Sequence, residues 1–237
     1  MNDTFLKAEW RKLLMANYLV EPNVLKKYVP YKTELDLWNG NCYLSLVGFM
    51  FLNTKIKGVS IPFHKNFEEV NLRFYVRYND SGLWKRGVVF IKEIVPKPAL
   101  TMVANMFYQE HYETLPMRHL WEEQGAKISV CYEWKKHSWY KIAAIAENNL
   151  SVINTGSEEE FITEHYWGYT KINESKTSEY QVEHPKWEVY PVIDFSIDVD
   201  FAEVYGSDFD FLSIEKPKSV LLAEGSEIKV FEGSEIF

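Results

Sequence analysis

The chain has 237 residues and a formal net charge of −8, from 26 Lys and Arg against 34 Asp and Glu. Nucleic-acid-binding proteins neutralise phosphates with clustered basic residues, so this acidic balance argues against that class of function. Aromatic residues make up 16% of the chain, which excludes a disordered protein, because disordered chains hold few of them. A chain of this length sustains a large core, and we expect one domain over residues 1–237.

No membrane-spanning or secretory segment is expected. The longest apolar run extends from Tyr43 to Leu52, which is shorter than the roughly 20 residues of a membrane helix. Charged side chains interrupt the start of the chain, where a signal peptide needs an apolar stretch. Cys42 and Cys131 show no metal-ligand spacing and are expected as two reduced thiols, although one bridge between them stays open. These features predict a cytoplasmic protein.

Short stretches rich in valine, isoleucine and aromatic residues dominate the chain and predict strands. In chain order the expected strands are 34–38, 43–52, 70–78, 88–95, 127–134, 166–172, 180–183 and 187–201. Asn39-Gly40 predicts a tight hairpin between the first two, because this dipeptide accepts positive φ angles. The second stretch is apolar on both alternating faces, which is typical of a strand covered on both sides.

Three short helices are expected, over residues 22–28, 99–112 and 158–164. Pro22 is suited to the first position of a helix, and apolar spacing of three and four residues predicts the second helix. Ser157 followed by Glu160 forms a capping-box pattern that begins the third. Together the elements predict an α+β domain, mainly antiparallel β, with a few helices packed against the sheet.

The expected strand 70–78, with the residues just before it, is the most informative segment for function. Because side chains alternate across a strand, Glu69, Asn71, Arg73, Tyr75 and Arg77 share one face, opposite an apolar face. In one interpretation the strand is half exposed and this polar face meets water. In the other it lines a cavity, where side chains about 7 Å apart along the strand grip a polar ligand. A buried Glu69 then needs a partner such as Arg73, because an unpaired buried charge is costly.

A second candidate region is the aromatic segment 161–170, where an expected helix leads into a strand. Its side chains either pack in the core or cover a ligand, and His165 and Tyr166 are its candidate ligand contacts. The six histidines show no zinc-binding spacing, so no metal site is expected. Nucleophile-elbow, phosphate-loop and dinucleotide motifs are absent from the sequence, and no cofactor is expected.

Several segments together resemble one known family. They are Trp10 with Asn17, the stretch 29–36, Gly40 with 43–49, the stretch 67–76, residues 163–166, His184-Pro185-x-Trp187, and Ala223-Glu224-Gly225-Ser226. In this order and spacing the chain resembles the YqjF-like family, catalogued as domain of unknown function 2071, which has no established activity. The resemblance implies an acetoacetate decarboxylase-like fold, a cone-shaped antiparallel sheet or barrel around an internal cavity with flanking helices.

The decarboxylase comparison concerns one catalytic lysine. In that enzyme a lysine that follows a proline forms a Schiff base, helped by burial and a neighbouring lysine that lower its pKa. The similar stretch here is Pro116-Met117-Arg118, and arginine stays protonated and is no nucleophile. Glu69 resembles the decarboxylase's cavity carboxylate. The resemblance therefore implies a cavity that has kept an acid and lost the nucleophile.

Three functions remain open from the sequence. The first is binding of a small oxygenated or anionic molecule in the sheet cavity, without a Schiff-base lysine, through Glu69, Asn71, Arg73, Tyr75, His165 and Tyr166. The second is a lyase or hydrolase with Glu69 as general acid or base and Arg73 as electrostatic stabiliser. The third, an interaction protein, predicts a filled barrel and an apolar surface patch. Besides a small-molecule ligand no partner, nucleic acid or membrane is expected, and homo-oligomerisation is left open.

Overall fold

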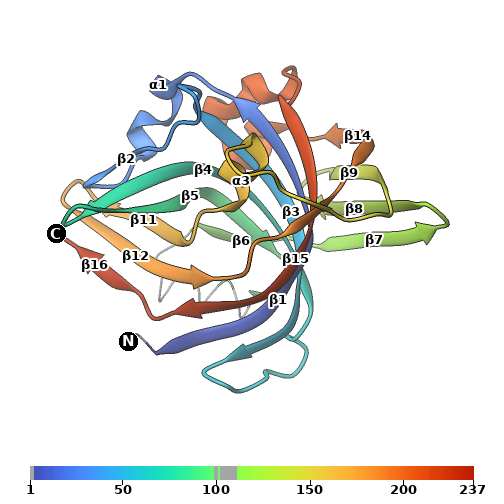
Figure 1. The fold of residues 1–237 in the computed structure, drawn as a ribbon, viewed down its shortest axis with the longest axis horizontal. Coiled ribbons are helices and arrows are strands. Elements are labelled where there is room, and N and C mark those ends of the chain that lie inside the picture. The colour runs from blue at the N-terminus through green and yellow to red at the C-terminus, as the bar shows by residue number, and fades with distance from the viewer. Residues whose placement is uncertain (1–2, 99–100, 102–110) are drawn as a thin grey trace.

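The computed structural model describes residues 3–98, 101 and 111–237, whose strands form two sheets (Figure 1). The larger sheet contains β1 (Thr4–Leu19), β2 (Thr33–Leu35), β3 (Tyr43–Ile56), β4 (Phe67–Asp80), β5 (Leu83–Val95), β6 (Tyr112–Thr114), β10 (Ser151–Val152), β11 (Trp167–Asn173), β12 (Lys176–Glu183), β13 (Glu188–Tyr190), β15 (Ser219–Phe231) and β16 (Ser234–Ile236). The smaller sheet contains β7 (Met117–Gln124), β8 (Lys127–Lys135), β9 (Trp139–Glu147) and β14 (Val192–Asp198).

The larger sheet curls until two of its strands meet again. Its central path runs β15, β1, β3, β4, β5, β11 and β12. The last strand of this path, β12, also pairs with the first, β15, through Val182 and Val230, which closes the curl. Most pairings are antiparallel, whereas β5 pairs in parallel with β11 and β6. Figure 1 shows the smaller sheet projecting to the right of this curled sheet. The expected strand-rich α+β fold with few helices is confirmed.

Alternate residues of the central strands enter two different apolar cores, as the period of a strand requires. Val70, Leu72 and Phe74 of β4 join the outer core, which also contains Tyr132 and Trp134 of the smaller sheet. The other face of β4 turns into the curl, where Tyr75 joins an inner core. β3 is buried from Tyr43 to Phe51, so the prediction of a strand covered on both sides is confirmed.

Helices are short. The described ones are α1 (Pro22–Leu25), continued by the 3₁₀ turn η1 (Lys26–Tyr28), then α3 (Glu158–Thr163), α4 (Phe201–Tyr205) and the 3₁₀ segment η2 (Ser207–Ser213). The first and third expected helices are thus confirmed. Ser157 caps α3 by accepting a hydrogen bond from the Glu160 backbone at 3.2 Å. The expected helix 99–112 lies almost entirely outside the described residues, and its last residue, Tyr112, belongs to β6.

Some strand predictions were incomplete or wrong. β1, β7, β9 and β15 were not expected at all. In β1 the alternation of side chains is interrupted because Lys12 has a φ of 53° and the register with β3 shifts between Arg11 and Leu14. The expected strand 187–201 divides at Pro191, where the chain leaves the larger sheet and enters the smaller one, and its last residue, Phe201, begins α4.

The turn at Asn39-Gly40 forms as expected, with φ angles of 50° and 80°. Trp38 and Asn41 exchange two backbone hydrogen bonds across it. The preceding strand, β2, however, pairs with β4 and not with β3. The dipeptide therefore predicted the turn correctly but not the partner of the strand before it.

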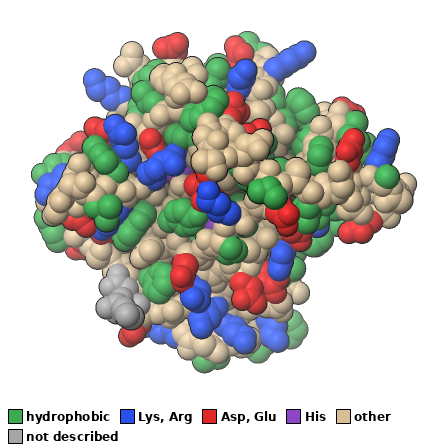
Figure 2. Space-filling view, in the orientation of Figure 1, with side chains coloured by type: hydrophobic (Ala, Val, Ile, Leu, Met, Phe, Trp, Pro, Cys, Tyr) green, Lys and Arg blue, Asp and Glu red, His purple; other side chains and the backbone are tan. Residues whose placement is uncertain are grey.

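Charged side chains of both signs, two free cysteines and short helices characterise the rest of the described chain. Figure 2 shows acidic and basic side chains interspersed over the face that it presents. Both cysteines are free, Cys42 being buried and Cys131 half-buried. Among the described residues, no helix combines the length and the apolar character that crossing a membrane requires.

Candidate binding cavity

A cavity of about 120 Å³ lies inside the curl of the larger sheet. Its walls are mainly aromatic and aliphatic, with Phe49, Phe51 and Phe67 among them. A cavity of about 150 Å³ holds a molecule the size of benzene, so this space suits a small organic molecule. The polar or titratable side chains in its wall include Glu69, Asn71, Arg73, Glu93, His165 and His184.

Three of the residues predicted from the sequence come from β4 and line this cavity. Glu69, Asn71 and Arg73 are 2%, 1% and 8% exposed. Their face of the strand therefore does not meet bulk water, and the interpretation of β4 as a half-exposed strand is wrong. The Glu69 carboxylate accepts hydrogen bonds from Asn71 Nδ2 at 2.9 Å and from the Tyr112 hydroxyl at 3.5 Å.

Arg73 does not form the expected pair with Glu69. Its Nη2 lies 3.8 Å from the Met15 sulfur, and its guanidinium carbon lies 5.9 Å from the centre of the Tyr75 ring. No carboxylate of the described residues forms an ion pair with it, and its Nε has no hydrogen-bond partner there. The cavity wall thus holds a buried guanidinium that forms no ion pair with the described residues, although Glu69 and Glu93 line the same cavity.

His165 enters the cavity wall from the loop between α3 and β11. Its Nε2 lies 3.1 Å from Asp36 Oδ2, which also accepts a hydrogen bond from Arg86 Nε at 2.6 Å. Burial is the main cause that lowers the pKa of His165 to about 4, against the hydrogen bond with Asp36. Burial opposes ionisation of Asp36, but the hydrogen bonds from His165 and Arg86 outweigh it and lower the pKa of that carboxyl. At neutral pH the pair is therefore a neutral imidazole and a carboxylate.

Tyr75 and Tyr166, also predicted as ligand contacts, do not line the cavity. The Tyr75 hydroxyl is hydrogen-bonded to Ser45 Oγ at 2.7 Å, and its ring packs 4.7 Å from the His165 ring. Tyr166 faces a separate outer pocket. Its hydroxyl donates a hydrogen bond to Glu164, and its ring stacks on the His184 ring with 4.6 Å between centres. Tyr75 thus contacts the wall through His165, and Tyr166 lies outside it.

Sequence reasoning missed Glu93 of β5, which lies opposite Asn71 and is 2% exposed. The register of β4 and β5 shifts between Leu72 and Arg73. Phe90 and Glu93, three positions apart, therefore both reach the cavity, although strict alternation would separate them. Tyr112 was missed because the pattern placed it on a helix.

The stretch compared with the decarboxylase lysine lies elsewhere. Met117 and Arg118 begin β7 of the smaller sheet, and Arg118 pairs with Glu133 at 2.5 Å. No lysine is among the described residues that line the cavity, and positions 1–2, 99–100 and 102–110 contain none in the sequence. Lys12 is buried, but it is held in a different cluster. Burial lowers its pKa, and hydrogen bonds with Glu224 and Tyr190 outweigh burial and raise it, so the amine stays protonated.

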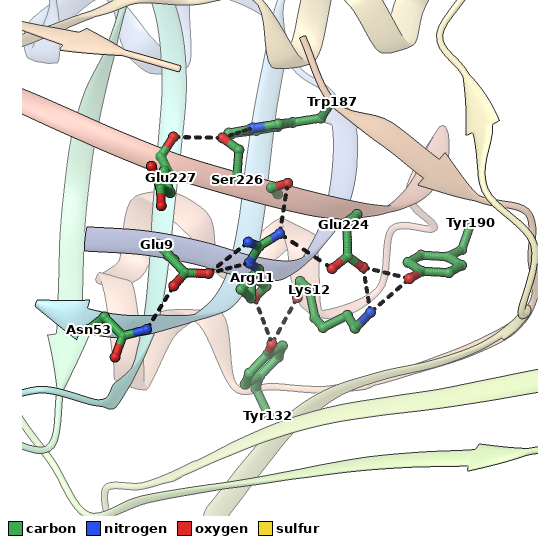
Figure 3. Close-up of polar contacts among 11 residues, drawn as sticks. Glu9, Arg11, Lys12, Asn53, Tyr132, Trp187, Tyr190, Glu224, Ser226 and Glu227 are labelled. Atoms are coloured by element: carbon green, nitrogen blue, oxygen red, sulfur yellow. Dashed lines mark hydrogen bonds and ion pairs between the residues drawn. The ribbon is translucent and has the colours of Figure 1, made fainter. Parts of the chain in front are cut away.

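The cluster around Lys12, with Glu224, Tyr190 and Tyr132, joins β1 to β15 and to the smaller sheet (Figure 3). Lys12 Nζ donates to the Tyr190 hydroxyl at 2.8 Å and pairs with Glu224. The Tyr132 hydroxyl of β8 donates to the Lys12 carbonyl at 2.8 Å. A Cβ on Gly225, whose φ is 82°, would lie 2.0 Å from the Trp10 carbonyl oxygen. Trp10, Glu224 and Gly225, which carry the family resemblance, therefore meet here, and the contact of Tyr132 with Lys12 connects them to the smaller sheet.

The curled sheet with its internal cavity defines an acetoacetate decarboxylase-like fold. An acetoacetate decarboxylase-like enzyme from Sphingomonas wittichii RW1 aligns with a TM-score of 0.67 and 9% identity, covering 99% of this chain and 94% of that one. Acetoacetate decarboxylase from Legionella pneumophila aligns with a TM-score of 0.67 and 10% identity over 98% and 87% of the two chains. The enduracididine biosynthesis enzyme MppR, complexed with pyruvate, aligns with a TM-score of 0.65 and 9% identity over 99% and 91%.

Within this fold the chain belongs to the DUF2071 family, described as an uncharacterized conserved protein, whose model matches residues 7–227. It is 26% identical over 185 residues to the uncharacterized protein YqjF of Bacillus subtilis (strain 168). That alignment covers 77% of this chain and 74% of YqjF. The resemblance found in the sequence is thus confirmed at the level of both family and fold.

Proposed function

We propose that this protein binds a small anionic molecule in the cavity, through Arg73 and without Schiff-base chemistry. The observation that supports this most is the buried Arg73 guanidinium, which lines the cavity and has no carboxylate partner among the described residues. A buried charge without an ion-pair partner is costly, and an anionic ligand would supply that partner through charge-assisted hydrogen bonds.

Other cavity residues support a polar ligand. Trp10 Nε1, Asn71 Oδ1, Arg73 Nε and His165 Nδ1 are buried and have no hydrogen-bond partner among the described residues. Folded proteins pair most of their buried polar atoms. A ligand with polar groups would offer partners for such atoms, while its carbon atoms contact the aromatic walls. The two free thiols fit a reducing compartment, and we place the protein in the cytoplasm.

Titration with butyrate, followed by ligand-observed NMR, tests this function. We expect Arg73→Gln to weaken binding about ten- to a hundredfold, because charge-assisted hydrogen bonds contribute about 1.5–3 kcal/mol. Arg77→Gln is the matched control, since Arg77 lies on the same strand but pairs with Glu34 at 2.6 Å at the surface. Equal affinity of Arg73→Gln and the wild type would contradict the proposal.

A second candidate is a lyase or hydrolase that uses Glu69 as general acid or base. It is favoured by a carboxylate that is 2% exposed, lines the cavity and accepts hydrogen bonds from Asn71 and Tyr112. Glu69→Gln should then abolish turnover of a cavity ligand and leave its binding intact. Borohydride reduction in the presence of pyruvate separates Schiff-base chemistry from both proposals, since we expect no mass adduct on any lysine.

A further inference from the structure

His165 presents one ring nitrogen to Asp36 and leaves the other without a partner. The imidazole ring is fixed on three sides, by Asp36 at 3.1 Å, by the Tyr75 ring at 4.7 Å and by the Phe161 ring at 5.1 Å between centres. Its Nδ1 is buried and has no hydrogen-bond partner among the described residues. The ring cannot turn without losing the Asp36 contact, so the unpaired nitrogen is a fixed feature of the cavity wall.

Asp36 determines which nitrogen carries the proton. An ionised carboxylate only accepts hydrogen bonds, so the Nε2 that faces it must donate. In the neutral imidazole Nδ1 is then a bare acceptor. The charged groups around the ring are Asp36, Arg86 and Arg73, and both arginines oppose a second proton on it. His165, a residue of the cavity wall, therefore carries an unpaired hydrogen-bond acceptor whose orientation Asp36 fixes.

Arg73 and His165 both lie beside the Tyr75 ring and line the same cavity. The guanidinium carbon of Arg73 lies 5.9 Å from the centre of the Tyr75 ring, and the His165 ring lies 4.7 Å from the same centre. Both side chains line the same cavity of about 120 Å³. The proposed anion-binding group and the residue that carries the acceptor thus belong to the wall of one small cavity.

We infer that the ligand is a small hydroxy acid, whose carboxylate pairs with Arg73 and whose hydroxyl donates to His165 Nδ1. The inference rests on the proposed anion site and extends it to a substrate class. A 2-hydroxy acid carries both groups on adjacent carbons of a small molecule, as a cavity of about 120 Å³ requires. A 2-keto acid presents a carbonyl oxygen, whose lone pairs repel those of Nδ1, so the site discriminates against it. Asp36 acts here as a positioning residue, because it contacts the imidazole and not the ligand.

Three matched acids test the inference: 2-hydroxybutyrate, butyrate and 2-oxobutyrate, titrated into the full chain at pH 7. We expect the wild type to bind 2-hydroxybutyrate about three- to tenfold more tightly than butyrate, the size of one neutral hydrogen bond. It should bind 2-oxobutyrate more weakly than butyrate. In His165→Phe the first two acids should bind alike, with butyrate affinity retained. This order of affinities in the wild type needs no variant, so the test remains if His165→Phe fails to fold.

The outcomes separate the two proposals. If the wild type binds none of the acids, the proposed anion site is wrong, and the inference with it. If it binds butyrate and 2-hydroxybutyrate equally, or prefers 2-oxobutyrate, only the inference is overturned. It is also overturned if the preference for the hydroxyl survives in His165→Phe, or is lost instead in His184→Phe, since His184 also lines the cavity.

The role of Asp36 has a spectroscopic test that a merely structural residue would not affect. ¹⁵N NMR distinguishes a protonated from a bare ring nitrogen, and comparison with His165→Phe assigns the His165 signals. We expect a protonated Nε2 and a bare Nδ1 in the wild type. Asp36→Asn should shift the proton towards Nδ1, because the amide can donate to Nε2, and the preference for 2-hydroxybutyrate should fall. An unchanged tautomer in Asp36→Asn, with the preference intact, contradicts the positioning role.

Discussion

His165 Nε2 lies 3.1 Å from Asp36 Oδ2, although the two residues are 129 positions apart in the chain. His165 lines the inner cavity, and Asp36 lines the outer pocket. The pair therefore forms part of the partition between them. In a wall that also contains Glu69, Asn71 and Glu93, His165 and Arg73 are the groups that bear on an anionic ligand.

The neutral state of His165 predicts how stability depends on pH. Its pKa is lowered to about 4 in the folded protein by burial, against about 6.5 in the unfolded chain. The unfolded chain binds more protons between these values, so the stabilisation is present above pH 6.5 and is lost as pH falls towards 4. From pH 7 to 5 we expect a loss of about 2 kcal/mol from this group. Urea unfolding should show a weaker dependence in His165→Gln, and an equal dependence would contradict the neutral state.

Glu224 is expected to stabilise the fold by neutralising Lys12, whose Nζ it shares with the Tyr190 hydroxyl. Glu224→Gln leaves a largely buried ammonium with a weaker partner and should lower the free energy of unfolding by about 1–3 kcal/mol. The control is Glu183→Gln, whose pair with Lys229 is exposed at the surface. It should change stability by less than about 1 kcal/mol. If urea unfolding gave equal losses of free energy for the two variants, the buried pair would contribute no more to stability than the exposed one.

Gly225 is required both by its φ and by the space around it. A Cβ there would lie 2.0 Å from the Trp10 carbonyl oxygen. Gly40 is the matched control, because its φ is 80° and nothing lies within 4 Å of a Cβ added there. Gly40→Ala should cost about 1–2 kcal/mol, the penalty of the left-handed region alone. Gly225→Ala should cost clearly more or prevent folding, as thermal unfolding would measure, and similar costs would show that the close approach to Trp10 relaxes freely.

Ser157 is expected to stabilise α3 through its hydroxyl, which accepts the Glu160 backbone hydrogen bond at 3.2 Å. Ser157→Ala should lower the free energy of unfolding by about 1 kcal/mol, and Ser157→Asp, which keeps an acceptor, should restore most of it. Denaturant titration of the three proteins measures this. Equal stability of the wild type and Ser157→Ala would contradict a role for the cap.

Local pattern was sufficient where one strand or one turn decides the outcome. The alternation along β4 placed Glu69, Asn71 and Arg73 on one face, and all three line the cavity. The capping pattern located α3, and Asn39-Gly40 located a turn. Pattern failed where the backbone is irregular, as at Lys12 in β1 and at the register shift between β4 and β5, because one extra residue reverses the faces of a strand.

The strand-rich fold, the family and the polar face of β4 could be read from the sequence, since each depends on residues near one another in the chain or on an extended pattern of resemblance. Which residues share the cavity depends on the tertiary structure. It brought Asp36 to His165 and placed Glu93 opposite Asn71, and it moved Tyr166 outside the wall. The physical reason is the closure of the sheet, which depends on the bulges and the pairing of distant strands and cannot be read from any single segment.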